Sequence, residues 1–111
     1  MSLFYHDGVN IPAAPYKDPE SVIDYGSKYD GWLAPSEVIA ISGYYVDGVL
    51  IQSNGQDVNG LVVDSTENNT TTTKAWLSGG VVGTSYTLTN RVTTSQGRTE
   101  DRSMIIMCQN K

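Results

Sequence analysis

Residues 75–108 read A-W-L-S-G-G-V-V-G-T-S-Y-T-L-T-N-R-V-T-T-S-Q-G-R-T-E-D-R-S-M-I-I-M-C, and this stretch decides the fold. Apolar Tyr86, Leu88 and Val92 recur with a period of two, while threonines occupy the positions between them. That alternation is typical of a β-strand with one buried face. A polar turn around Gly97 follows, and a second apolar strand ends the stretch. The pattern predicts a long β-hairpin that contributes one face to a core.

The whole chain contains roughly seven or eight predicted short strands, with turn signals between them. Asp47-Gly48 is a strong hairpin dipeptide, and residues 58–63 are expected to form one strand with a bulge at Gly60. We expect an all-β, two-sheet β-sandwich, as an immunoglobulin-like Greek key or, alternatively, a jelly roll. The predicted core consists of Val38, Ile39 or Ile41, Leu50, Val62, Leu77, Tyr86, Leu88, Val92, Met104 and Ile106.

The chain of 111 residues is long enough for a single domain. Residues 1–21 contain three prolines and no sustained period, which favours an extended N-terminal arm, and residues 22–111 form the sandwich domain. The tip of the arm, Leu3, Phe4 and Tyr5, is apolar. It is expected either to fold back onto its own sandwich or to lie on a neighbouring subunit.

The last strand is apolar on both faces near its end. Met104, Ile106 and Cys108 alternate with Ile105 and Met107, so only one of these sets can face the core. We expect the other set to be covered by the arm or by a partner.

The net charge of −5 argues against nucleic acid as the main partner. Residues 1–67 carry ten acidic and two basic side chains, whereas residues 68–111 carry five basic and two acidic ones. Either the two halves interleave and their charges mix, or the molecule carries an oriented dipole that steers docking.

No window of 18 apolar residues predicts a membrane span, and the first ten residues do not resemble a signal peptide. Cys108 is the only cysteine, so an intrachain disulfide is excluded, and folding in a reducing compartment is expected.

The sequence offers no catalytic constellation. His6 is the only histidine, which leaves no two-histidine metal site and no rigid place for a histidine-based triad. The clustered acids Asp18, Glu20 and Asp24 lie in or beside the arm, away from any predicted cleft. We therefore expect neither an enzyme nor a cofactor. Flat aromatic side chains such as Trp32 could still bind carbohydrate or a protein partner.

Several segments together resemble small structural proteins of tailed bacteriophages, specifically the capsid decoration (staple or cement) proteins of epsilon-fifteen-type short-tailed phages. The segments are Y-K-D-P-E-S-V-I-D-Y at 16–25, D-G-W-L at 30–33, W-L-S-G-G at 76–80, G-T-S-Y at 83–86, N-R-V-T-T at 90–94 and G-R-T-E-D-R-S at 97–103. Residues 53–67 carry none of this pattern.

The resemblance implies a virion protein, made in the host cytoplasm, that binds the outer surface of the capsid and clamps neighbouring major capsid proteins. A homodimer on the capsid lattice is expected, with no nucleic acid or membrane partner. The alternatives are a carbohydrate- or receptor-binding β-sandwich and another virion connector subunit. Interface residues are expected to be Leu3, Phe4, Tyr5, Tyr16, Trp32, Arg98, Arg102, Ile105 and Met107.

Overall fold

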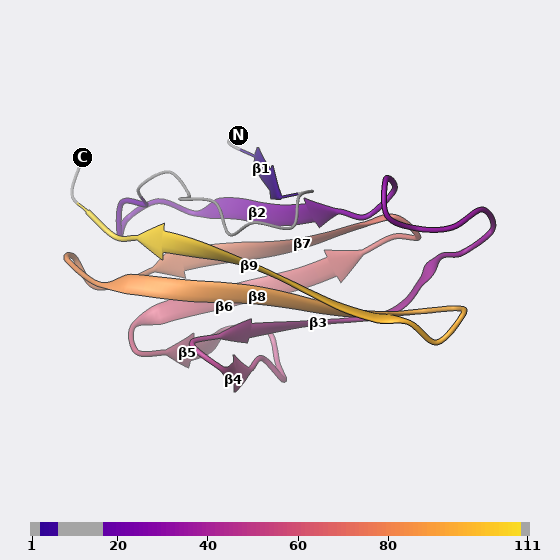
Figure 1. Ribbon diagram of the computed structural model, residues 1–111. Coiled ribbons are helices and arrows are strands. Elements are labelled where there is room, and N and C mark those ends of the chain that lie inside the picture. The colour runs from indigo at the N-terminus through magenta and orange to yellow at the C-terminus, as the bar shows by residue number, and fades with distance from the viewer. Residues whose placement is uncertain (1–2, 7–16, 110–111) are drawn as a thin grey trace.

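The computed structural model describes residues 3–6 and 17–109, which form two packed β-sheets (Figure 1). Long runs of alternating threonine and apolar side chains favour strands, since these side chains fit a half-buried pleated surface. The strands are β1 (Leu3–His6), β2 (Ile23–Lys28), β3 (Ile39–Val46), β4 (Val49–Leu50), β5 (Gln56–Val58), β6 (Leu61–Asn68), β7 (Thr72–Gly79), β8 (Ser85–Thr94) and β9 (Thr99–Met107).

The strand order identifies the sandwich as an immunoglobulin-like Greek key, which was the first of the two predicted topologies. One sheet has the order β1-β2-β7-β6-β5 and the other β4-β3-β8-β9. Strands β2, β7 and β6 occupy the places of immunoglobulin strands B, E and D, and β3, β8 and β9 those of C, F and G. The prediction of an all-β, two-sheet sandwich is confirmed.

The described parts of the N-terminal segment lie on the sandwich. β1 pairs in parallel with β2 at the edge of the five-stranded sheet, from Leu3 beside Asp24 to His6 beside Ser27. Further along, Lys17 bridges to Cys108 beyond the end of β9, in the other sheet. Residues 1–2 and 7–16, and with them the expected interface residue Tyr16, lie outside the described residues.

Lys17 fastens this segment to the body of the sandwich. Its side chain is buried, and its ammonium donates hydrogen bonds to the carbonyls of Asp18 (3.0 Å), Ser21 (2.8 Å) and Gly79 (2.8 Å). Burial lowers the pKa of Lys17, while the three carbonyls satisfy the charged form.

The core consists of a large cluster along most of the sandwich and a small one at one end. The small cluster contains Tyr29, Ile39 and Val92, with Trp32 and Leu33 packed against it. The large cluster contains Tyr25, Tyr44, Val46, Val58, Leu61, Val63, Ala75, Leu77, Tyr86, Leu88, Met104, Ile106 and Cys108.

Three residues that were predicted to be buried are not. Leu50 is 40% exposed, Val38 is half-buried, and Val62 is half-buried between the buried Leu61 and Val63. The error at Val62 has a physical cause, because residues 58–63 are not one strand. Asn59 (φ 53°) and Gly60 (φ 94°) form the turn of the β5–β6 hairpin, which resets the alternation of faces.

Of the predicted pair Ile39 and Ile41, Ile39 is buried and Ile41 is 67% exposed. β3 carries a register shift between Ile39 and Ile41, which places Ile41 on the solvent face.

A buried polar network separates the two core clusters. The side-chain oxygen of Asn90 accepts hydrogen bonds from the hydroxyls of Tyr29 (2.6 Å) and Thr73 (2.9 Å). Thr73 lies on β7, and Tyr29 directly follows β2, so both lie on the side of the five-stranded sheet. The amide nitrogen of Asn90 donates to Ser42 (3.0 Å) and to the carbonyl of Gly43 (2.9 Å). Asn90 therefore ties β3, β7 and β8 together across the interior.

The strand order also mixes the acidic and basic halves of the sequence. Each sheet contains strands from both halves, so bases of the second half meet acids of the first. Lys74 lies 3.8 Å from Asp24 and 3.7 Å from Glu67, and Arg98 pairs with Glu37. A simple separation of charge by sequence half is therefore absent from the described part of the chain.

Candidate interaction surfaces

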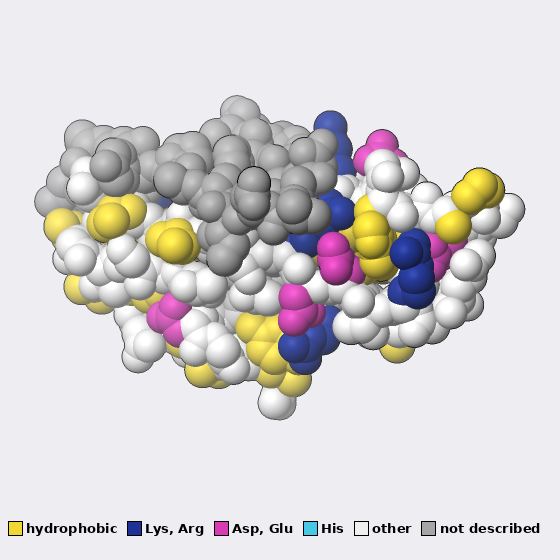
Figure 2. Space-filling view, in the orientation of Figure 1, with side chains coloured by type: hydrophobic (Ala, Val, Ile, Leu, Met, Phe, Trp, Pro, Cys, Tyr) yellow, Lys and Arg dark blue, Asp and Glu magenta, His cyan; other side chains and the backbone are white. Residues whose placement is uncertain are grey.

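The outer face of the four-stranded sheet is flat and rich in hydroxyl groups. Ladder pairing places the outward side chains of β8 and β9 in rows, such as Thr89 opposite Ser103 and Thr93 opposite Thr99. The hydroxyls of Thr89 and Ser103 lie 2.8 Å apart. Figure 2 looks onto this side of the molecule and shows mainly uncharged polar surface, broken by single apolar and charged side chains.

One charged pair lies in the middle of that face. Arg91 on β8 makes two hydrogen bonds to Asp101 on β9, at 2.7 and 2.9 Å, and a third to the hydroxyl of Tyr45 at 3.1 Å. The guanidinium also lies 5.0 Å from the centre of the Tyr45 ring. The pair lowers the pKa of Asp101, mainly through the hydrogen bonds from Arg91. These exposed groups satisfy one another and fix the geometry of the face.

Ile105 and Met107 lie on the same face near the end of β9. Ile105 is 43% exposed and pairs with Thr87, while Met107 is half-buried and pairs with Ser85. The prediction that these two side chains point away from the core agrees with the structure. β1 pairs with β2 in the other sheet and also contacts β9.

Trp32 and Arg98 meet at the opposite end of the sandwich. The Arg98 guanidinium lies 4.1 Å from the centre of the Trp32 ring and donates to the Trp32 carbonyl at 3.2 Å. It also donates to both carboxylate oxygens of Glu37, at 2.9 Å through Nε and through a second, shorter contact. Glu37 further accepts hydrogen bonds from Thr94 (2.5 Å) and from the backbone of Ala34 (2.9 Å). The cluster clamps the loop before β3 onto the β8–β9 turn.

Arg102 lies close to that clamp but is buried, at 7% exposure. Its guanidinium lies 4.3 Å from the centre of the Tyr29 ring and donates to the Lys28 carbonyl at 2.5 Å. The Tyr29 ring in turn packs edge-on against Trp32, with centroids 5.9 Å apart. The structure therefore groups Trp32 with Arg98 and Arg102 and gives the two arginines internal partners, whereas Ile105 and Met107 lie further along β9.

The Glu37 clamp predicts a specific loss of stability in acid. Hydrogen bonds from Arg98, then Thr94 and Ala34, hold the pKa of Glu37 at about 2, below its ordinary value of 4.5. Because the folded-state pKa is lowered, the contribution is complete above pH 4.5 and is lost as the pH falls toward 2. We expect Glu37→Gln to lower the melting temperature at pH 7 by roughly 5–10 °C, with a smaller difference at pH 3.

Thermal unfolding followed by circular dichroism between pH 2.5 and 7 measures this effect. Glu67→Gln is the matched control, because Glu67 is exposed and has only a 3.7 Å contact with Lys74. An equal, pH-independent difference for both variants would contradict the assignment.

The β7–β8 turn presents two apolar side chains to solvent. Val81 and Val82 are 51% and 50% exposed. The turn is rigid: Thr84 donates to the Val81 carbonyl (3.0 Å), Gly83 to the Cys108 carbonyl (2.8 Å), and Val81 to the Tyr86 hydroxyl (3.1 Å). The pair Val81-Val82 between glycines could have indicated this exposure from the sequence, since apolar side chains in a tight turn have few positions in which they can reach the core.

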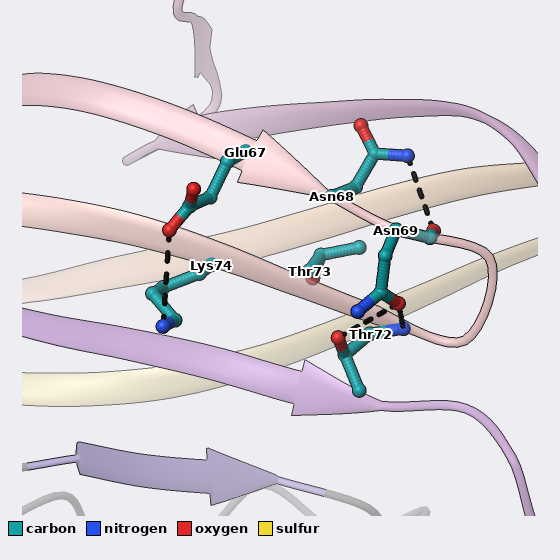
Figure 3. Close-up of a pocket in the computed structure, with 6 residues that line it drawn as sticks. All are labelled: Glu67, Asn68, Asn69, Thr72, Thr73 and Lys74. Atoms are coloured by element: carbon teal, nitrogen blue, oxygen red, sulfur yellow. Dashed lines mark hydrogen bonds and ion pairs between the residues drawn. The ribbon is translucent and has the colours of Figure 1, made fainter.

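A polar hollow of about 250 Å³ lies beside the β6–β7 turn (Figure 3). Asn69 dominates it: its side-chain oxygen accepts hydrogen bonds from the Thr72 backbone (2.8 Å) and hydroxyl (2.9 Å), which stabilises the turn. Lys74 and Glu67 face each other across it. The polar groups are engaged within the hairpin, so the hollow is a feature of turn structure.

Other chemistry is limited within the described residues. No group of three or more His, Cys, Asp and Glu side chains there could hold a metal ion. No helix in that part of the chain is long and apolar enough to cross a membrane. Cys108 is buried, and burial raises the pKa of its thiol.

Comparison with known proteins gives one match. The family described as "Podophage GP4 fiber-tail adaptor protein gp77" matches residues 17–107, which include strands β2 to β9 but not β1. No curated protein matches the chain. The match supports the coarser part of the resemblance inferred from sequence, a structural protein of short-tailed phages, while its description differs from a capsid decoration protein.

Proposed function

The chain belongs to the podophage GP4 fiber-tail adaptor family, which makes it a structural protein of short-tailed phages, and we propose that it acts as a connector between the tail and its fibers. The observation that carries this proposal is the family match over residues 17–107. We further propose that the role is non-enzymatic, since the polar groups around Glu37, Asn69 and Asn90 are engaged in structural networks.

The form of the molecule suits a connector. An immunoglobulin-like sandwich presents two ends and two outer faces from a rigid body, so separate surfaces can hold separate partners. The exposed apolar side chains Val22, Ile41, Val81, Val82 and Ile105 lie on more than one of these surfaces. Exposed apolar groups at several positions are the expected property of a subunit that is partly buried in a larger assembly.

Deletion of the gene tests the proposal. Particles assembled without this protein are expected to contain filled heads but to lack fibers, and supplying the protein in trans is expected to restore them. The fiber content of purified particles is measured by quantitative mass spectrometry and negative-stain microscopy. Fibers at wild-type level on the deletion particles would overturn the proposal.

The same deletion particles also test the alternative function of a capsid clamp. In that function the chain is a homodimer on the capsid lattice and its partner is the major capsid protein. That function predicts normal fibers and shells that break at lower temperature. It also requires hundreds of copies per virion, whereas a connector at the single tail requires about a dozen.

A further inference from the structure

One end of the sandwich combines exposed apolar side chains with an excess of acidic groups. This end, called here the β7–β8 end, contains the start of β2, the β3–β4, β5–β6 and β7–β8 turns and the end of β9. The ladder registers place these together: Ile23 pairs with Leu77, Leu61 with Gly79, and Ser85 with Met107.

Five of the exposed large apolar side chains lie at the β7–β8 end. Val22 (59% exposed) precedes β2, Val49 (45%) follows the β3–β4 turn, Val81 and Val82 form the β7–β8 turn, and Ile105 (43%) lies near the end of β9. Because two backbone hydrogen bonds and a third bond to the Tyr86 hydroxyl fix the β7–β8 turn, its two valines are held in place before any partner arrives. A preorganised apolar group loses little conformational entropy on binding.

The exposed charged side chains that the structure describes at this end are all acidic. Asp18, Glu20, Asp47 and Asp57 belong to it, and the last three are exposed. Its only base among the described residues is Lys17, which is buried with its ammonium on three carbonyls.

The other described bases, Lys28, Lys74, Arg91, Arg98 and Arg102, lie in the middle or toward the opposite end. In Figure 2 the dark blue side chains lie mainly in the middle and on the right, away from the left, where β9 ends in Figure 1.

We propose that the β7–β8 end docks onto a virion protein that presents an apolar depression bordered by lysine and arginine side chains. This inference rests on the proposed connector function and assigns one of its two partner surfaces. The apolar side chains supply the desolvated centre of the contact, and the acids supply complementary charge at its border. A symmetric contact between two copies through this end would bring acids against acids, which disfavours a second copy as occupant.

Binding to adaptor-deficient particles tests the inference. Particles from the gene-deletion phage are mixed with purified full-length chain, and the bound fraction is measured by co-sedimentation across a concentration series. The double variant Val81→Ser/Val82→Ser is expected to bind at least about tenfold more weakly. The control variant is Ile41→Ser. Ile41 is an apolar side chain that is 67% exposed and lies toward the opposite end of the sandwich.

Charge is tested by a second matched pair. Glu20→Gln lies at the β7–β8 end and Glu67→Gln toward the other, so both variants change the net charge equally. Glu20→Gln is expected to weaken binding about threefold and to reduce its salt dependence, whereas Glu67→Gln leaves both unchanged. Melting temperatures of all variants within a few degrees of wild type exclude misfolding as the cause.

The outcomes separate the two proposals. Wild-type chain that binds the particles and restores fibers, with both β7–β8 variants binding equally well, overturns the docking surface and leaves the connector function standing. Wild-type chain that fails to bind overturns both. Concentration-dependent self-association in sedimentation velocity, abolished by Val81→Ser/Val82→Ser, would identify a second copy as the occupant and also overturn the inference.

Discussion

Replacing Asn90 by alanine is expected to destabilise the sandwich by roughly 3–5 kcal/mol, a large part of the total stability of a domain of this size. The substitution leaves the buried hydroxyls of Tyr29 and Thr73 without their Asn90 acceptor and removes the amide hydrogen bond to the Gly43 carbonyl. Each unsatisfied buried group costs about 1–3 kcal/mol, and the low polarity of the interior strengthens the effect.

Urea denaturation measures this loss, with Thr89→Ala as the matched control. Thr89 neighbours Asn90 on β8 but points outward, where its hydroxyl contacts that of Ser103. We expect the control to lose about 0.5 kcal/mol. Asn90→Ala with a midpoint equal to that of Thr89→Ala would show that the network does not hold the two sheets together.

Replacing Gly80 by alanine is the second change with a large expected effect, of roughly 2–5 kcal/mol. Gly80 has φ of +106°, and a Cβ atom there would lie 2.3 Å from the Cys108 sulfur. Cys108 is fully buried after the last strand, so its short side chain cannot move aside. The substitution therefore combines backbone strain with overpacking.

A double-mutant cycle separates these two causes. In Gly83→Ala the added Cβ atom has no neighbour within 4 Å, and the φ of +84° is unfavourable for alanine. This variant therefore measures the cost of backbone strain alone. Cys108→Ala removes the sulfur, so the pair Gly80→Ala/Cys108→Ala is expected to be more stable than the sum of the single effects predicts. Strict additivity of the two substitutions would contradict the predicted clash.

The sequence allowed the sandwich to be predicted because the residues of β8 alternate cleanly between apolar and polar. The inward set on β8, including Tyr86, Leu88 and Val92, is buried as expected. The error at residues 58–63 arose from reading Asn59-Gly60 as a bulge inside an apolar run, although that dipeptide also signals a hairpin turn. Local pattern alone does not decide between the two, since both accommodate a glycine.

The surface was harder to predict than the core. Trp32, Glu37 and Arg98 are separated by more than sixty residues at their extremes, so only the folded chain shows that they form one clamp. Arg102 was expected at an interface, yet its inward position on β9 and the Tyr29 ring beneath it bury the guanidinium. The exposure of Val81 and Val82 depends on the turn geometry that Gly80 and Gly83 permit. The hydrophobic periodicity of the sequence carries no information about that geometry.

A reconstruction of the intact virion by electron cryomicroscopy tests the connector function most directly. The account predicts density for this sandwich at the junction of tail and fibers, in about a dozen copies arranged around the tail axis. Density for the sandwich spread across the capsid shell in hundreds of copies, and absent from the tail, would contradict it.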